Sequence, residues 1–183
     1  MLNTQKTILF DIDKILAKLN ISETQKVADL GCGNFGFFVF PLAKLVGKNG
    51  RVYAIDILKD VLKEIKSQAD AYNLSQIETI WSDLEVFKAT KIETDSLDAI
   101  TIINVLSQIN KKNNALKEAA RMVKTGGKIL IIDWKKSDIP FGPEAEKRIS
   151  IEEIKDLCAR LGLKINEEFA AGPYNYGLIL TKF

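Results

Sequence analysis

The sequence predicts an α/β fold: a seven-stranded, mostly parallel sheet with helices on both faces and an antiparallel last strand. Two features of the chain support this prediction. Short apolar runs rich in β-branched residues alternate with amphipathic stretches of helical period, which is the pattern of parallel strands joined by helices. The last two extended runs, 163–170 and 176–183, are separated by too few residues for a helical crossover, so they should form an antiparallel hairpin.

The first part of the chain predicts two helices flanking a strand, then a second strand and a third helix. Residues 11–19 carry apolar side chains at helical spacing, with an aspartate in position to cap the helix. Residues 26–30 form a buried-strand pattern and run into a glycine turn, after which an apolar helix over 35–45 should end near a glycine. An Asn-Gly turn precedes the strand 52–56, and residues 59–72 again place apolar residues on one helical face.

The second part of the chain continues the alternation. A short strand is expected over 77–81, and the continuous β-branched run 97–104 suits a central strand covered on both faces. A helix over 113–123 should be followed by a Thr-Gly-Gly break before the strand 128–132. A capping box opens the helix 150–161, since its first serine is followed three residues later by glutamate.

The composition is that of an ordinary soluble domain. The chain has 183 residues, of which 46% are hydrophobic and 27% charged, so one domain with a sizeable core is expected. A net charge of +2 neither favours nor excludes a nucleic-acid partner. The chain contains no histidine, which removes the commonest general base and the commonest metal ligand together. Cys32 and Cys158 lack the clustered spacing of a zinc site, and we expect neither a metal site nor a disulfide.

The N-terminal segment and the hydropathy pattern predict a cytoplasmic protein. Charged residues follow the N-terminus too soon for a signal peptide, and no apolar run reaches the roughly twenty residues that cross a bilayer. We divide the chain into an N-terminal helical arm, residues 1–25, and one domain, residues 26–183.

The strongest local signal is the glycine turn Asp29-Leu30-Gly31-Cys32-Gly33, together with Asp56 at the end of the second strand. Glycine permits backbone angles closed to other residues and lets a ligand approach the main chain closely. A carboxylate at a strand end can accept hydrogen bonds from both hydroxyls of a ribose. A purely structural turn, and a helix cap at Asp56, are the alternatives. Placed between two strands, the arrangement favours a nucleoside-type ligand.

These residues resemble the motifs of class I S-adenosylmethionine-dependent methyltransferases, whose Rossmann-like fold has an antiparallel last strand. The resemblance extends over residues 26–183. The family has an acidic residue before a G-x-G turn, as at 29–33, and a ribose-binding carboxylate at the position of Asp56. Ser82-Asp83 resembles its adenine-contacting position, and Asn104-Val105 lies where it lines the methionine end and the reaction centre. Within the family, the chain resembles small quinone-type methyltransferases.

The resemblance implies S-adenosylmethionine as the cofactor, bound by a definite set of residues. The chain departs from the family pattern at Phe35, where many members have a third glycine; here the next glycine is Gly36. The cysteines of arsenite methyltransferases and the Asn/Asp-Pro-Pro-Tyr/Phe signature of amino-methylating nucleic-acid enzymes are both absent. The expected cofactor contacts are Asp29, Gly31, Cys32, Gly33, Phe35, Asp56, Ile57, Asp83, Leu84 and Asn104.

No residue stands out as catalytic, and Asp133 after the fifth strand is the candidate for a base; capping of a loop, or pairing with Lys135 or Lys136, is the alternative. Methyl transfer from a sulfonium depends chiefly on positioning, so a base is needed only for a poorly nucleophilic acceptor. Trp134, Phe141, Tyr174 and Tyr176 fall where such a sheet places its substrate. They either line an acceptor pocket or pack the loops onto the sheet.

Three functions follow from these observations. The first is methyl transfer from S-adenosylmethionine to a small or medium-sized acceptor, with a small molecule favoured and nucleic-acid or protein acceptors left open. The second is a cofactor-binding module without catalysis. The third is a nicotinamide-dependent oxidoreductase, which would need a parallel last strand. The sequence does not fix the oligomeric state.

Overall fold

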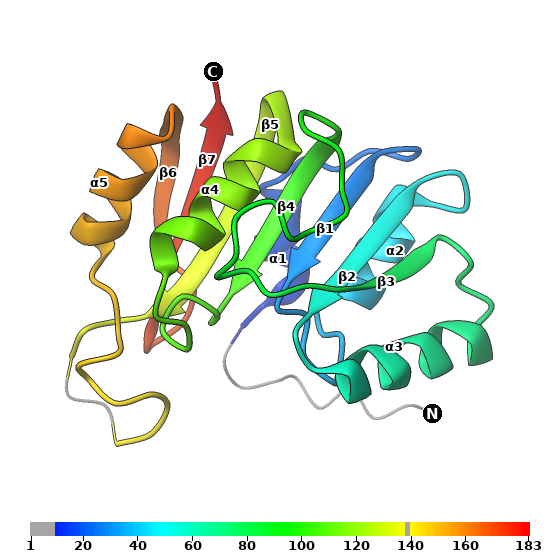
Figure 1. Cartoon of the computed structure of the whole chain (residues 1–183), viewed down its shortest axis with the longest axis horizontal. Coiled ribbons are helices and arrows are strands. Elements are labelled where there is room, and N and C mark those ends of the chain that lie inside the picture. The colour runs from blue at the N-terminus through cyan, green and yellow to red at the C-terminus, as the bar shows by residue number, and fades with distance from the viewer. Residues whose placement is uncertain (1–9, 138–139) are drawn as a thin grey trace.

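The computed structural model describes residues 10–137 and 140–183, and within them one seven-stranded sheet has the strand order β3-β2-β1-β4-β5-β7-β6. β1 to β5 pair in parallel, and β7 is antiparallel to both β5 and β6 (Figure 1). The predicted α/β class and terminal hairpin are confirmed. Residues 1–9 of the predicted arm lie outside the described range. The strands are β1 (Lys26–Leu30), β2 (Arg51–Asp56), β3 (Ile77–Trp81), β4 (Leu97–Ile103), β5 (Val123–Trp134), β6 (Leu163–Ala170) and β7 (Asn175–Lys182).

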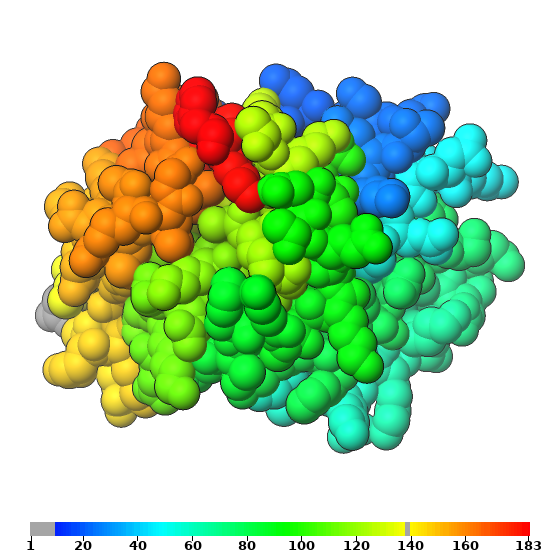
Figure 2. Space-filling model, turned by 45° about the horizontal axis from the view of Figure 1, so that its top comes forward, coloured from blue at the N-terminus to red at the C-terminus, as the bar shows by residue number. Residues whose placement is uncertain are grey.

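Helices cover both faces of the sheet. α1, α2 and α3 bury their apolar residues in one cluster, and α4 and α5 bury theirs in another. Figure 1 shows α4 and α5 in front of the sheet and α1 and α2 behind it. In the space-filling view, α5 in orange lies beside α4 in yellow-green, and α4 separates it from the green β3–β4 segment (Figure 2). The helices are α1 (Ile12–Ala17), α2 (Val39–Val46), α3 (Lys59–Ala71), α4 (Lys112–Met122) and α5 (Ile151–Arg160).

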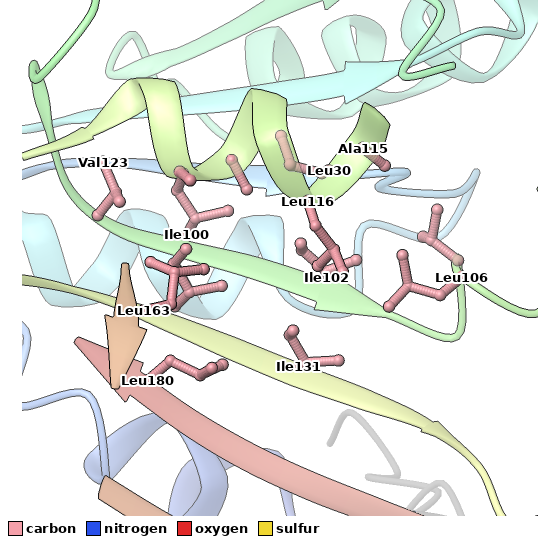
Figure 3. Close-up of a cluster of buried hydrophobic side chains, with 14 of the residues drawn as sticks. Leu30, Ile100, Ile102, Leu106, Ala115, Leu116, Val123, Ile131, Leu163 and Leu180 are labelled. Carbon is pink, nitrogen blue, oxygen red and sulfur yellow. The ribbon is translucent and has the colours of Figure 1, made fainter. Parts of the chain in front are cut away.

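The central strands supply both apolar clusters, because successive side chains of a strand point to opposite faces. In β4, Ile100 and Ile102 join the cluster of α4 and α5, while Ala99 joins the cluster of the other three helices. Figure 3 shows Leu116 of α4 beside Ile102. Burial on both faces explains why the central strands are continuous apolar runs rather than alternating ones.

Two predicted helix starts are confirmed in detail. Asp11 caps α1 by accepting a hydrogen bond from the amide of Lys14 over 3.3 Å. At α5, Ser150 Oγ accepts from the amide of Glu153 over 3.2 Å, and Glu153 Oε2 accepts from the amide of Ser150 over 2.8 Å. Each contact satisfies an amide that the first helical turn leaves without a partner.

The predicted start of the second helix is wrong. α2 begins at Val39 rather than at residue 35, because Gly36 has a φ of +54°, a left-handed value that a right-handed helix cannot contain. Phe35 and Phe37 therefore lie in the preceding turn and are 66% and 48% exposed, whereas Phe38 is buried.

The predicted fifth strand is too short. β5 runs from Val123 to Trp134 and so includes the Thr-Gly-Gly sequence that was expected to break the chain. The register of β4 with β5 shifts between Leu97 and Ala99, and this irregularity absorbs the extra residues of β5. Gly126, with a φ of +79°, makes the local distortion possible.

Cys32 and Cys158 are free thiols, buried in different apolar clusters. In the part of the chain that the structure describes, no helix is both long and apolar enough to cross a bilayer. The carboxyl ends of β1, β2 and β4 meet at one edge of the sheet, because these strands are parallel neighbours. An open parallel sheet binds its ligand at this edge.

Candidate active site

The turn after β1 needs its two glycines for different reasons. Gly31 has a φ of +74°, and a Cβ there would overlap Cγ2 of Val105. Its amide and that of Cys32 donate to the carbonyl of Ile55 over 2.8 and 3.0 Å, which holds the turn against β2. Gly33 has a φ of +62°, but no atom lies within 4 Å of its Cβ position. Gly31 therefore serves packing, whereas Gly33 leaves main chain open to a ligand.

Asp56, the last residue of β2, supports this turn. Its side chain is largely buried; Oδ2 accepts from the amide of Gly33 over 3.1 Å and Oδ1 from the amide of Leu58 over 2.9 Å. The carboxylate is thereby fixed at the wall of a pocket of about 530 Å³, called the Asp56 pocket below. The Asp56 pocket is lined by Gly31, Gly33, Asn34, Asp56, Ile57, Leu58, Val61, Ser82, Asp83, Leu84, Glu85, Val105, Gln108 and Ile109.

A second pocket, of about 300 Å³, adjoins the first and is called the Phe35 pocket below. Most of its side chains are apolar or aromatic, and its ionisable residues are Asp29 and Cys32. The two pockets share Gly31, Gly33 and Asn34, together with Gln108, so they meet at the glycine turn. The Phe35 pocket is lined by Phe10, Ile12, Asp29, Gly31, Cys32, Gly33, Asn34, Phe35, Phe37, Phe38, Ile103, Asn104 and Gln108.

Asp29, near the carboxyl end of β1, is a buried carboxylate. It is 3% exposed and accepts a hydrogen bond from Thr101 Oγ1 over 2.6 Å. Burial raises its pKa from 3.8 to about 7; the Thr101 hydrogen bond opposes this shift, and the negative charge of Asp56 adds to it. A cationic group of a ligand in the Phe35 pocket would stabilise the ionised form.

Asn104 directly follows β4 and is held on three sides. Its φ of +57° is left-handed, a conformation that asparagine adopts more readily than most residues. Its amide donates to the carbonyl of Ile132 over 2.7 Å, and its carbonyl accepts from Nε2 of Gln108 over 2.6 Å. Its side-chain Oδ1 accepts from Nδ2 of Asn175 in β7 over 2.9 Å. Both its backbone and its side chain are therefore fixed at the Phe35 pocket.

The segment after β3 forms a wall of the Asp56 pocket and is tied to the loop before α4. Asp83 Oδ1 accepts from the amide of Glu85 over 2.8 Å. The Glu85 carboxylate accepts from the amides of Asn110 and Lys111 over 3.2 and 3.0 Å. These contacts hold together two loops that would otherwise move separately.

All of the predicted cofactor contacts line these pockets, although they come from loops far apart in the sequence. Asp56, Ile57, Asp83 and Leu84 line the Asp56 pocket; Asp29, Cys32, Phe35 and Asn104 line the Phe35 pocket; Gly31 and Gly33 line both.

Sequence reasoning missed several residues of the site. Thr101 was detectable as a hydroxyl within the apolar run 99–103, and it lies in register with Asp29. Gln108 lines both pockets, yet an exposed glutamine in a loop gives no signal in a single sequence. Asn34, next to Gly33, also lines both pockets.

Asp133, the predicted base, lines neither pocket. Its side chain is fully buried, and its two oxygens accept from the amides of Trp134 and Ser107 over 2.8 and 3.2 Å. Burial raises its pKa above the usual value, against the hydrogen bonds from these neighbours. In this structure Asp133 joins the end of β5 to the loop after β4.

The predicted aromatic cluster packs on itself. The rings of Trp134 and Phe141 are 6.0 Å apart, those of Phe141 and Tyr174 are 4.8 Å apart, and both pairs are edge to face. Tyr176 donates its hydroxyl to the carbonyl of Ile149 over 2.9 Å. These described residues line neither pocket, so they pack loops onto the sheet.

The sequence matches a family model, that of a methyltransferase domain, over residues 21–171. The chain belongs to the methyltransferase domain family. The methyltransferase superimposes on the S-adenosylmethionine-dependent methyltransferase from Aquifex aeolicus with a TM-score of 0.87 and 25% identity, covering 99% of this chain and 94% of that one. The predicted class and S-adenosylmethionine as cofactor are confirmed, and the nicotinamide-dependent alternative is removed.

The methyltransferase also resembles curated proteins named demethylmenaquinone methyltransferase. It is 29% identical to the one from Bacillus mycoides over 115 residues, which cover 63% of this chain and 47% of that protein. It is 26% identical to the one from Bacillus subtilis over 158 residues, which cover 86% of this chain and 66% of that protein. The chain thus spans between about half and two thirds of the length of these relatives.

Proposed function

We propose that this methyltransferase moves the methyl group of S-adenosylmethionine to a small, uncharged acceptor that carries an apolar ring. The observation that supports the proposal is the meeting of two unlike pockets at one glycine turn. Three carboxylates and open main chain line the Asp56 pocket beside aliphatic side chains, whereas the Phe35 pocket has four phenylalanine rings. S-adenosylmethionine supplies an activated methyl group when bound, so the protein chiefly has to position the acceptor.

The residues of the Asp56 pocket fit the adenosine half of the cofactor. Asp56 is fixed at the pocket wall by two amides and can accept hydrogen bonds from ribose hydroxyls. Gly33 leaves space where any other residue would place a Cβ. Ile57 is 52% exposed beside Asp56 and offers an apolar surface for the purine. Asp29, in the adjoining Phe35 pocket, can pair with the α-ammonium group of the cofactor's methionine half.

The residues of the Phe35 pocket fit an apolar ring. Phe35 and Phe37 stack with ring centroids 5.3 Å apart, yet both rings remain substantially exposed. Covering a phenylalanine fully is worth about 1.5–3 kcal/mol, so a flat ligand gains by lying on this pair. Burial raises the pKa of the Cys32 thiol, which keeps it neutral, and a charged acceptor would find no cation among the described lining residues. The names of the curated relatives agree with a ring-bearing acceptor.

A base is not assigned in this proposal. A phenol or quinol is uncharged when it binds and has to lose its hydroxyl proton as the methyl group is transferred; the ionisable residues among those that line the Phe35 pocket are Asp29 and Cys32. Residues 26–183 form the catalytic domain, and the arm 1–25 contributes Phe10 and Ile12 to the acceptor side.

The test is turnover with chosen acceptors. The purified protein is incubated with S-adenosylmethionine and either a naphthoquinol kept reduced by dithionite or a hydroxybenzoate, which carries a carboxylate on a similar ring. Formation of S-adenosylhomocysteine and of the methylated product is followed by mass spectrometry. We expect turnover of the naphthoquinol and little turnover of the hydroxybenzoate. The reverse preference, or turnover of protein or nucleic acid alone, would overturn the proposal.

A further inference from the structure

Asn175 is a buried polar residue that the proposed function leaves unused. It begins β7, is fully buried, and lies in register with Trp134 of β5. Its Nδ2 donates to Asn104 Oδ1 over 2.9 Å, but its own Oδ1 is buried and accepts no hydrogen bond from the described residues. An unpaired buried oxygen costs stability, which an apolar side chain would avoid. Among the described residues, the contact with Asn104 is thus the one hydrogen bond of this side chain.

The contact occupies the side-chain oxygen of Asn104, a residue that lines the Phe35 pocket. An asparagine side chain has one oxygen and one NH2 group. Asn175 donates to the oxygen of Asn104, so the NH2 group is the hydrogen-bonding group left for a ligand. The backbone of Asn104 is held by Ile132 and Gln108, so the amide cannot be redirected by a small shift of the main chain.

The pocket then presents two complementary groups to a ligand. Asp29 is an acceptor that becomes negative when ionised, and the NH2 group of Asn104 is a neutral donor. An α-amino acid has a positive ammonium and a negative carboxylate attached to the same carbon, and these two groups match the acceptor and the donor. Hydrogen bonds to a charged group are about twice as strong as those between neutral groups.

We propose that Asn175 is a positioning residue, which orients the Asn104 amide so that Nδ2 donates to the carboxylate of the cofactor's methionine moiety. The inference rests on the cofactor of the proposed function, but not on the identity of the acceptor. Asn175 acts through Asn104 and touches no ligand itself, since it lines neither pocket.

Two ligands that differ in the amino acid group test this inference. S-adenosylhomocysteine carries the group, and methylthioadenosine has the adenosine and the sulfur without it. Isothermal titration measures the affinity of both for the wild type and for Asn175→Leu, which has a similar volume and cannot donate. We expect S-adenosylhomocysteine to bind about tenfold more weakly to Asn175→Leu, and methylthioadenosine to bind as it does to the wild type.

A double-mutant cycle separates positioning from a general structural role. Asn104→Gly removes the amide while tolerating the left-handed backbone. If Asn175 acts through Asn104, adding Asn175→Leu to Asn104→Gly causes no further loss of S-adenosylhomocysteine affinity. Additive losses would overturn the inference. So would equal weakening of both ligands by Asn175→Leu, or S-adenosylhomocysteine affinity within twofold of the wild type.

The matched control is Gln76→Leu. Gln76 is 5% exposed and donates to the carbonyl of Ala43 over 3.0 Å, so the change removes a buried amide hydrogen bond remote from both pockets. We expect a lower melting temperature with unchanged affinities. If Asn175→Leu does not fold, Asn175→Ser, which has a shorter side chain, takes the place of Asn175→Leu in every measurement. A wild type that binds neither ligand would contradict the proposed function, whereas the outcomes above concern Asn175 alone.

Discussion

Thr101 and Asp29 lie opposite each other in the register of β4 and β1, and the threonine hydroxyl donates to the aspartate carboxylate over 2.6 Å. β1 has a neighbouring strand on each side, which keeps this carboxylate away from water. Burial raises its pKa to about 7, so the fold holds a partly protonated acid at neutral pH. An ammonium group bound beside Asp29 would favour its ionised form, so cofactor binding and protonation are linked.

Cofactor affinity should therefore depend on pH. We expect S-adenosylhomocysteine to bind more tightly as the pH rises to about 7 and to lose up to tenfold in affinity for each pH unit below it, because a protonated Asp29 cannot pair with the ammonium. Isothermal titration from pH 5.5 to 8 measures this dependence. Asp29→Asn should bind weakly with little pH dependence. A wild-type affinity that is constant over this range would contradict the assignment of Asp29.

The stability of the ligand-free protein should change with pH in the opposite direction. The folded pKa of Asp29, about 7, lies above its unfolded value of 3.8, so the folded state binds more protons between these values. The stability that this group contributes is fully present below about pH 4, is lost as the pH rises toward 7, and does not change further above pH 7. The total loss from this group is up to about 4 kcal/mol. Urea unfolding at pH 5 and pH 8 measures the change. Asp29→Asn should show much less of this change in stability with pH. If the variant shows an equal change, groups other than Asp29 cause it.

The two glycines of the turn should respond differently to alanine. Gly31→Ala overlaps Val105, so we expect a loss of several kcal/mol in the free energy of unfolding. A Cβ at position 33 meets no atom, so Gly33→Ala has only the cost of a left-handed alanine, about 1–2 kcal/mol. Gly33 lines both pockets, however, so the added methyl group takes up space where they meet. Gly33→Ala should fold and bind S-adenosylhomocysteine at least tenfold more weakly. Tight binding by Gly33→Ala would contradict a cofactor at this turn.

The features that the sequence predicts correctly are those that a short segment of the chain determines. The turn at 29–33, the carboxylate of Asp56 and the capping box at Ser150 each depend on a few neighbouring residues, and parallel strand ends bring the first two together. The pattern of apolar runs was sufficient to predict the layers of the fold, because each face must be covered.

The features that the sequence did not predict depend on contacts between distant residues. The start of α2 was misplaced because Gly36 could continue or interrupt an apolar helix, and only its φ of +54° decides this. The role of Asn175 depends on the antiparallel position of β7, which brings it to Asn104 across 71 positions of sequence. Asp133 looked available at a strand end, but the tertiary structure buries it and satisfies both oxygens.

Glu118 of α4 should be essential for the wall of the Asp56 pocket. It is fully buried and accepts from the amides of Lys88 and Thr90 over 2.9 and 3.2 Å, and from Arg121 over 2.7 Å. Thr90 in turn is hydrogen-bonded to Ser82 of the pocket over 2.9 Å. Glu118→Ala leaves both amides unpaired and removes the carboxylate from Arg121, whose guanidinium keeps the carbonyls of Ile92 and Thr90 as acceptors. We therefore expect a loss of about 3–5 kcal/mol in urea unfolding and weaker S-adenosylhomocysteine binding.

The control for this change is Lys117→Ala, an exposed neighbour on the same helix, which should alter neither quantity. An unchanged stability of Glu118→Ala would mean that water replaces its hydrogen bonds, and the segment after β3 would then need another anchor.

The stacked pair Phe35 and Phe37 should determine acceptor binding without affecting the fold. Both rings are exposed in the turn before α2, so Phe37→Ala removes little buried surface, and we expect less than about 1 kcal/mol of lost stability. If an apolar ring lies on this pair, KM for the naphthoquinol rises about tenfold while S-adenosylhomocysteine affinity is unchanged. Phe87→Ala is the matched control, because Phe87 is 45% exposed and lines neither pocket. Equal effects of the two variants on KM would show that the acceptor binds elsewhere, since of these two residues only Phe37 lines the Phe35 pocket.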